Sequence, residues 1–83
     1  MGQAPSNTPG PLTIATGTQI RHAMIDANIR TNTELAGKAG VSVPTIGRIL
    51  KGETSASIET YQAIAKALNI PLSKLITAAE ARL

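Results

Sequence analysis

The chain has 83 residues and therefore holds at most one domain, and it contains no Phe, no Trp and a single Tyr. It has no Cys and one His, which excludes a disulfide framework or a thiolate zinc site and makes a bound metal ion or cofactor unexpected. Eight Lys and Arg residues against five Asp and Glu residues give a formal net charge of +3, which is compatible with a polyanionic partner.

The first residues differ in composition from the rest of the chain. Residues 1–12 hold three of the five Pro residues, two Gly residues and no charge, a composition that favours neither a helix nor a packed core. From Ile14 onward, apolar residues recur at helical spacing, and a core rich in Ala favours closely spaced helices. We therefore expect a disordered tail over residues 1–13 and one all-α domain over residues 14–83.

The first two helices are predicted over residues 14–28 and 31–39. The apolar face of the first is formed by Ile20, Ala23, Met24 and Ala27. Thr31 followed by Glu34 is a capping box, in which the hydroxyl accepts from a backbone N–H and the carboxylate reaches back, so the second helix begins there. Gly40 can adopt the left-handed conformation that ends this helix after barely two turns.

Three more helices are predicted over residues 43–51, 58–68 and 71–83. The first of them has Ser42 as its N-cap and Pro44 in its first turn, where a missing N–H breaks no intrahelical bond. The inward face of the helix over 58–68 is expected to hold Ile58, Tyr61, Ile64, Ala65 and Leu68. The apolar stripe of the last helix is long for a terminal helix, so we expect it to form a homodimer interface through Leu75, Ile76, Ala79 and Leu83.

Residues 31–52 form the pattern of a helix-turn-helix, two short helices joined by a turn around Gly40. Ala36 and Gly40 are small enough for the two helices to approach closely, and Val41 and Ile46 can fill the space between them. In this motif the first helix crosses the DNA backbone and the second lies in the major groove. The pattern therefore predicts binding to double-stranded DNA.

The motif and the helices around it resemble the lambda repressor and Cro family. The residues that carry the resemblance are Glu34-Leu35-Ala36, Gly40-Val41-Ser42, Thr45-Ile46, Arg48-Ile49 and Gly52. Similar fragments run from about Thr16 to Ile76, and together they imply a five-helix fold and operator binding. The sequence departs from the family pattern at Arg30, where an apolar residue is usual and where Ile29 is expected to take that role.

Helical geometry divides the helix over 43–51 into two faces. Ile46, Ile49 and Leu50 point inward, which directs Pro44, Gly47, Arg48 and Lys51 outward. Arg48 is the expected main base reader, because its guanidinium can bond guanine O6 and N7 together. A glycine at position 47 has two possible explanations: it lets the backbone approach DNA closely, or it leaves room for packing inside the protein. The predicted base-reading set is Val43, Pro44, Thr45, Gly47 and Arg48.

Contacts to DNA phosphates are expected from polar and basic residues around this helix. The positive N-terminal end of the helix over 31–39 favours such contacts. For Lys38 a merely solvated position is an equal alternative, and Arg21 and Lys66 are expected in solvent. The predicted phosphate-contacting set is Asn32, Thr33, Lys38, Ser42, Lys51, Thr54 and Ser55.

The function expected from these features is that of a phage- or plasmid-type repressor, a homodimer on an inverted-repeat operator, in the cytoplasm of a bacterial or phage-infected cell. No apolar run reaches the roughly 18 residues of a membrane span, and no small-molecule ligand is indicated. No catalytic constellation is evident, so we expect no enzyme. The alternative is an antitoxin or co-regulator that mainly holds a partner protein, suggested by the long apolar stripe of the last helix.

Overall fold

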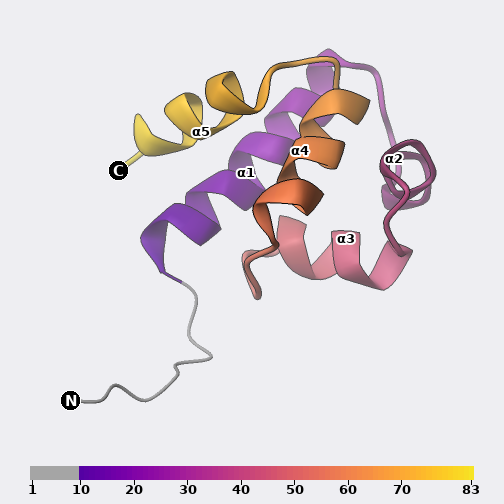
Figure 1. The fold of residues 1–83 in the computed structure, drawn as a ribbon, viewed down its shortest axis with the longest axis horizontal. Coiled ribbons are helices and arrows are strands. Elements are labelled where there is room, and N and C mark those ends of the chain that lie inside the picture. Colours follow the sequence, from indigo (N-terminus) through magenta and orange to yellow (C-terminus); the bar gives the residue numbers. More distant parts are fainter. Residues whose placement is uncertain (1–9) are drawn as a thin grey trace.

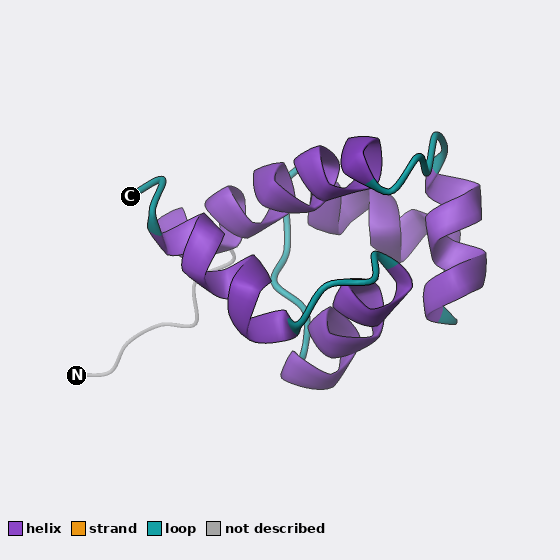
Figure 2. Cartoon of the chain, turned by 90° about the horizontal axis from the view of Figure 1, so that it is seen from above, coloured by secondary structure: helices purple, strands orange, loops and turns teal. Residues whose placement is uncertain are grey.

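The computed structural model describes residues 10–83, so residues 1–9, which make up most of the expected tail, lie outside the described part. Within residues 10–83 there are five helices and no strand (Figure 1, Figure 2). The all-α, five-helix prediction is therefore confirmed. The helices are α1 (Pro11–Asp26), α2 (Asn32–Ala39), α3 (Val43–Leu50), α4 (Ile58–Ala67) and α5 (Leu72–Glu80).

The start of α1 corrects one sequence prediction. The helix begins at Pro11, three residues before the expected start at Ile14, so residues 11–13 are helical and do not belong to a tail. Pro11 stands at the first helical position, where its missing N–H costs no hydrogen bond, and the Ile14 N–H donates to the Gly10 carbonyl at 3.2 Å. The proline that suggested a tail is in fact a helix start.

The predicted caps of α2 and α3 are confirmed. The Thr31 hydroxyl accepts from the Glu34 N–H at 3.0 Å, and the Ser42 hydroxyl accepts from the Thr45 N–H at 3.3 Å. Gly40 ends α2 with a φ of 71°, in the left-handed region. One detail differs, because the Glu34 carboxylate accepts from the Arg30 N–H at 3.3 Å rather than from Thr31.

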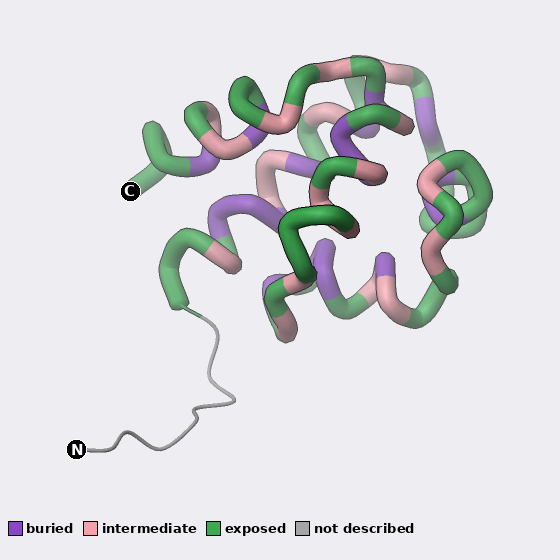
Figure 3. The backbone as a smooth tube through the Cα atoms, in the orientation of Figure 1, coloured by how far each residue is buried: buried purple, intermediate pink, exposed green. Residues whose placement is uncertain are grey.

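All five helices contribute to one core. α1 packs against α3 and α5, and α2 packs against α3 and α4. Figure 3 shows the buried stretches turned toward the interior of this arrangement and the exposed stretches on its outside. Each helix supplies at least one fully buried aliphatic side chain, and α3 supplies two; they are Ile20, Leu35, Ile46, Ile49, Ile64 and Leu75. Large aromatic residues are therefore not needed to close the core.

Two expectations about apolar faces are wrong. Ile58 is 73% exposed, because it is the first residue of α4 while the buried residues of α4 lie in its second half. Leu75 and Ala79 are 1% and 0% exposed within the single chain, where α5 lies beside α1 (Figure 1). They are therefore not available to a second copy. Of the predicted dimer residues, Ile76 is half-buried and Leu83 is exposed.

None of the helices within residues 10–83 has the length and apolar character needed to cross a membrane.

Candidate nucleic-acid interface

A direct backbone contact with α1 fixes the C-terminal end of α3. Gly17 of α1 is buried, and a Cβ atom added there would lie 2.5 Å from the Ile49 carbonyl oxygen and 3.1 Å from that of Leu50. Only glycine permits this approach without a shift of either helix. The orientation of α3 is therefore set by the packing of the fold.

The two faces of α3 are separated as the helical spacing predicted. Ile46, Ile49 and Leu50 are buried, whereas Pro44, Arg48 and Lys51 are exposed. In Figure 1, α3 lies along the lower edge of the helical body, with α1 and α4 above it. Its outer face therefore forms a ridge that no other part of residues 10–83 covers.

The N-terminal end of α3 presents small and apolar groups beside this ridge. Val43 is 41% exposed, and Pro44 is exposed next to it. The hydroxyl of Ser42 donates to the Thr45 hydroxyl at 2.7 Å, so these two side chains hold each other in place. Apolar groups in such a position can pack on thymine methyl groups, and hydroxyls can contact bases or phosphates.

Gly47 lies half-buried on the outer side of α3, next to the start of α2. A Cβ atom at this position would meet only the Asn32 Nδ2 atom, at 3.9 Å, which is an ordinary van der Waals distance. Packing clearance inside the described chain therefore does not require a glycine here. Of the two readings of Gly47, close approach to a partner is the one that this geometry favours.

Most of the predicted phosphate-contacting residues lie on the surface near α3. Asn32 and Thr33 are exposed in the first turn of α2, Lys51 caps the end of α3, and Ser55 is exposed after it. Thr54 is half-buried, and its hydroxyl donates to the Ser55 carbonyl at 3.2 Å.

Lys38 is the member of the set that the structure separates from the others. It borders a pocket shared with Asp26, Glu34 and the connection between α4 and α5, and no residue of α3 lines this pocket. The surroundings of Lys38 therefore include two acidic residues and no part of α3.

Two basic residues near α3 were not predicted as site residues. Arg21 of α1 and Arg30 of the α1–α2 connection line one surface pocket together with Lys51. Arg21 lies one helical turn beyond Gly17, the residue that contacts α3, but the sequence alone does not show that contact. Arg30 stands at the position where the sequence departs from the family pattern.

Solved structures of two bacterial regulators share this fold. The clp gene regulator ClgR from Corynebacterium glutamicum is 24% identical, with a TM-score of 0.79 over 87% of this chain and 92% of that chain. The restriction-modification controller protein C.AhdI from Aeromonas hydrophila is 21% identical, with a TM-score of 0.71 over 76% of this chain and 94% of that chain. At these identities the likeness shows a common fold.

The sequence itself matches a family profile described as helix-turn-helix over residues 20–75, which is more than half of the chain. No curated protein matches it in sequence. The profile covers α2, α3 and α4 in full, together with the C-terminal part of α1 and the start of α5. The chain therefore belongs to the lambda-repressor-like (Xre-type) helix-turn-helix family of DNA-binding transcriptional regulators.

Proposed function

We propose that the protein is a sequence-specific repressor of the phage or plasmid Cro-like type that reads operator DNA with the outer face of α3. The observation that carries this proposal is the uncovered ridge of Pro44, Arg48 and Lys51 on a helix whose inner face is fully buried. A helix mounted in this way can enter the major groove without any change in the core.

Base reading is assigned to the residues along this ridge. Arg48 bonds guanine O6 and N7, because its planar guanidinium matches that pair of acceptors. Val43 and Pro44 pack on thymine methyl groups, and Thr45 reaches a base or a phosphate. Gly47 lets the helix backbone approach the edges of the base pairs closely.

The surrounding polar residues position the helix by contacting phosphates. Asn32 and Thr33 act at the N-terminal end of α2, where free backbone N–H groups favour an anion. Such contacts fix the register of the protein on the duplex and carry no sequence information themselves. The other members of the proposed set are Lys38, Ser42, Lys51, Thr54 and Ser55.

Selection of bound duplexes from a random DNA pool tests the proposal directly, followed by Arg48→Ala on the selected operator. We expect a loss of about 1 to 3 kcal/mol, or roughly 5- to 150-fold in Kd, with relaxed preference at one base pair. The thermal stability should hardly change, because Arg48 is exposed. Lys74→Ala, which removes an exposed charge on α5, serves as the control and should leave base preference intact. If no motif is enriched, or if Arg48→Ala binds the selected operator with the same affinity and base preference, the assignment is contradicted.

We also propose that two copies bind an inverted repeat whose half-sites are about 34 Å apart, as helix-turn-helix dimers do. Ile76 and Leu83 of α5 are the apolar residues of the predicted interface that the single chain leaves at least partly exposed. Two-fold symmetry in the selected motif, together with a dimer mass in sedimentation, would support this arrangement.

The antitoxin or co-regulator alternative has lost part of its support. It was suggested by the apolar stripe of α5, and two members of that stripe, Leu75 and Ala79, are now accounted for by packing within the chain. DNA reading by α3 therefore remains the function that the geometry favours.

A further inference from the structure

One surface pocket beside α3 differs from its neighbours in charge. It has a volume of about 310 Å³ and lies between α1, the α1–α2 connection and the second half of α3. Arg21, Arg30 and Lys51 line it, and no acidic residue does. We call this pocket, with these three residues and Asn32, the cation groove.

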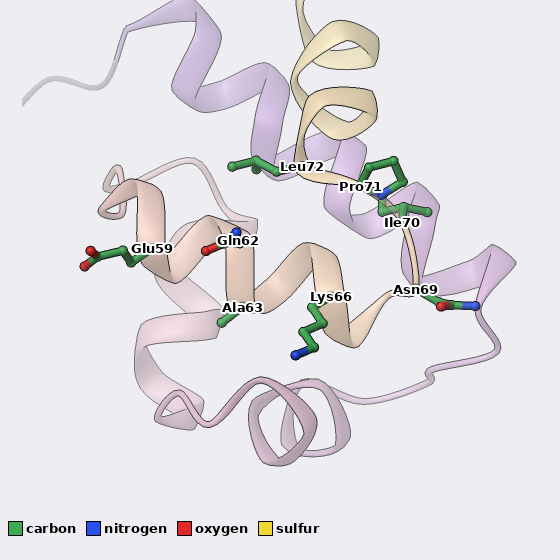
Figure 4. Close-up of a pocket in the computed structure, with 8 residues that line it drawn as sticks. All are labelled: Glu59, Gln62, Ala63, Lys66, Asn69, Ile70, Pro71 and Leu72. Carbon is green, nitrogen blue, oxygen red and sulfur yellow. The ribbon is translucent and has the colours of Figure 1, made fainter.

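Two other pockets show that this charge bias is not general. The pocket beside α4 in Figure 4, of about 690 Å³, is lined by one acidic residue, Glu59, and one basic residue, Lys66. The pocket around Lys38, of about 440 Å³, includes Asp26 and Glu34. Opposite charges are balanced in the first and acidic residues outnumber the single base in the second. The cation groove alone among the three carries only positive charge.

The cations of the groove come from three separate parts of the fold. Arg21 lies on α1, Arg30 precedes the cap of α2, and Lys51 is the C-cap of α3. Their Coulomb repulsion is unfavourable for the isolated chain, although solvent weakens it because all three are exposed. An arrangement of this kind is stabilised when an anion lies between the cations.

The floor and the position of the groove indicate which anion it suits. Met24, Ile29 and Leu50, which are buried, supply the apolar floor of the groove, and the exposed cations around it supply its only charges. Gly47, one residue from Arg48, also lines the groove. An arginine guanidinium can bond two phosphate oxygens at once, and two arginines stand here.

We propose that the cation groove binds a backbone phosphate of the operator at the C-terminal end of α3. This inference rests on the proposed function and extends it to Arg21 and Arg30, which hold the duplex against α3 together with Asn32 and Lys51. The contact adds affinity without reading sequence, because phosphates are the same at every base pair.

The salt dependence of DNA binding tests the proposal. Arg21→Gln, Arg30→Gln and the double variant are compared with the unchanged chain on the selected operator and on a scrambled duplex, from 50 to 200 mM salt. Loss of this one phosphate contact should lower the salt slope by about 0.9, so in the double variant the fall in affinity over this range should shrink by about threefold, with a smaller change in each single variant. Relative to the unchanged chain, each variant should lose a similar factor of affinity on both duplexes.

Lys66→Gln and Lys74→Gln are matched controls, because each removes one exposed positive charge outside the groove. If the arginine variants change the slope no more than these controls do, the groove is not a phosphate site. Thermal melting checks that every variant is folded. Failure of the unchanged chain to bind any duplex would instead contradict the proposed function as a whole, so the two failures are distinguishable.

A second measurement locates the contact. Neutral methylphosphonate groups are placed one at a time along the operator backbone, and each duplex is titrated with the unchanged chain and with the double variant. At one position per half-site the substitution should weaken the unchanged chain and have little effect on the double variant, because the two changes remove the same contact. If the loss of affinity caused by the methylphosphonate adds to that caused by the double variant at every position, the inference is overturned.

Discussion

Two glycines in the middle of helices, Gly17 and Gly47, lie on opposite sides of α3 and differ in what surrounds them. A Cβ atom on Gly17 would lie 2.5 Å from a backbone oxygen of α3, whereas one on Gly47 would have no neighbour closer than 3.9 Å. Each glycine costs roughly 1 kcal/mol in a helix relative to alanine. The fold itself accounts for that cost at Gly17, but nothing in residues 10–83 accounts for it at Gly47.

The same division applies to the rest of α3. Ile46 and Ile49 on the inner face are 0% and 1% exposed, so their size and shape are fixed by the neighbouring helices. Arg48 and Lys51 on the outer face are exposed and contribute little to the core. Substitutions on the inner side should therefore change stability, and substitutions on the outer side should change DNA binding with the fold intact.

Among the variants that test this division, Gly17→Ala should have the largest effect on stability. The added methyl group would meet the carbonyl oxygens of Ile49 and Leu50, which are backbone atoms and cannot rotate away as a side chain can. Overpacking costs typically 1 to 3 kcal/mol, and we expect the upper end here because the contact is with backbone atoms. A net loss of about 2 kcal/mol then remains after the gain of about 1 kcal/mol in helix propensity. For a domain of this size that is a fall in Tm of about 8 to 16 °C, measured by thermal melting.

Gly37→Ala is the matched control for this variant. Gly37 also lies inside a helix, but it is exposed and a Cβ atom there would meet nothing within 4 Å. We expect it to stabilise the protein by up to about 1 kcal/mol. Equal melting temperatures for the two alanine variants would show that the α1–α3 contact does not need a glycine.

Gly47→Ala should separate stability from function. The new methyl group has room within the chain, so the free energy of unfolding should rise by up to about 1 kcal/mol through helix propensity alone. Under the proposed function the same methyl group intrudes between α3 and the base pairs, so the Kd for the selected operator should rise severalfold. Thermal melting checks the expected gain in stability, and DNA titration checks the expected loss of affinity. A stabilised variant with undiminished affinity would show that Gly47 is not kept for DNA.

Features that depend on a few neighbouring residues were predictable from the sequence. The caps at Thr31 and Ser42, and the left-handed residue Gly40, need only side chains within about four positions. The inner and outer faces of α3 followed from helical periodicity in the same way. These local rules determined where the candidate reading face lies.

Features that depend on distant parts of the chain were not predictable. The stripe of α5 is expected from the sequence to face a second copy, because a sequence does not show that α5 packs against α1 and α4 and buries Leu75 and Ala79. The convergence of Arg21, Arg30 and Lys51 likewise joins three segments up to 30 positions apart. One local feature also differs from the prediction: the composition around Pro11 favours a tail, whereas the structure places Pro11 as the first residue of α1.

The smallest effects are expected at Ser42, which combines a role in the fold with a place on the outer face. Its hydroxyl caps α3 through a 3.3 Å bond from the Thr45 N–H in an exposed position, so Ser42→Ala should cost only about 0.5 kcal/mol, near the lower limit for such caps. Ser42→Asp keeps a capping oxygen and places a negative charge at the positive end of the helix, so stability should be preserved.

DNA affinity should rank these two variants in the opposite order from thermal stability. The aspartate brings a negative charge toward the phosphates that Ser42 is proposed to contact, so its affinity should fall below that of the less stable alanine variant. The gap between the two should narrow as salt is added, because screening weakens the repulsion. If Ser42→Asp bound the operator as tightly as the unchanged chain at low salt, the N-terminal end of α3 could not lie against the DNA backbone. Because stability and affinity rank the two variants oppositely, a loss of folding cannot imitate this result.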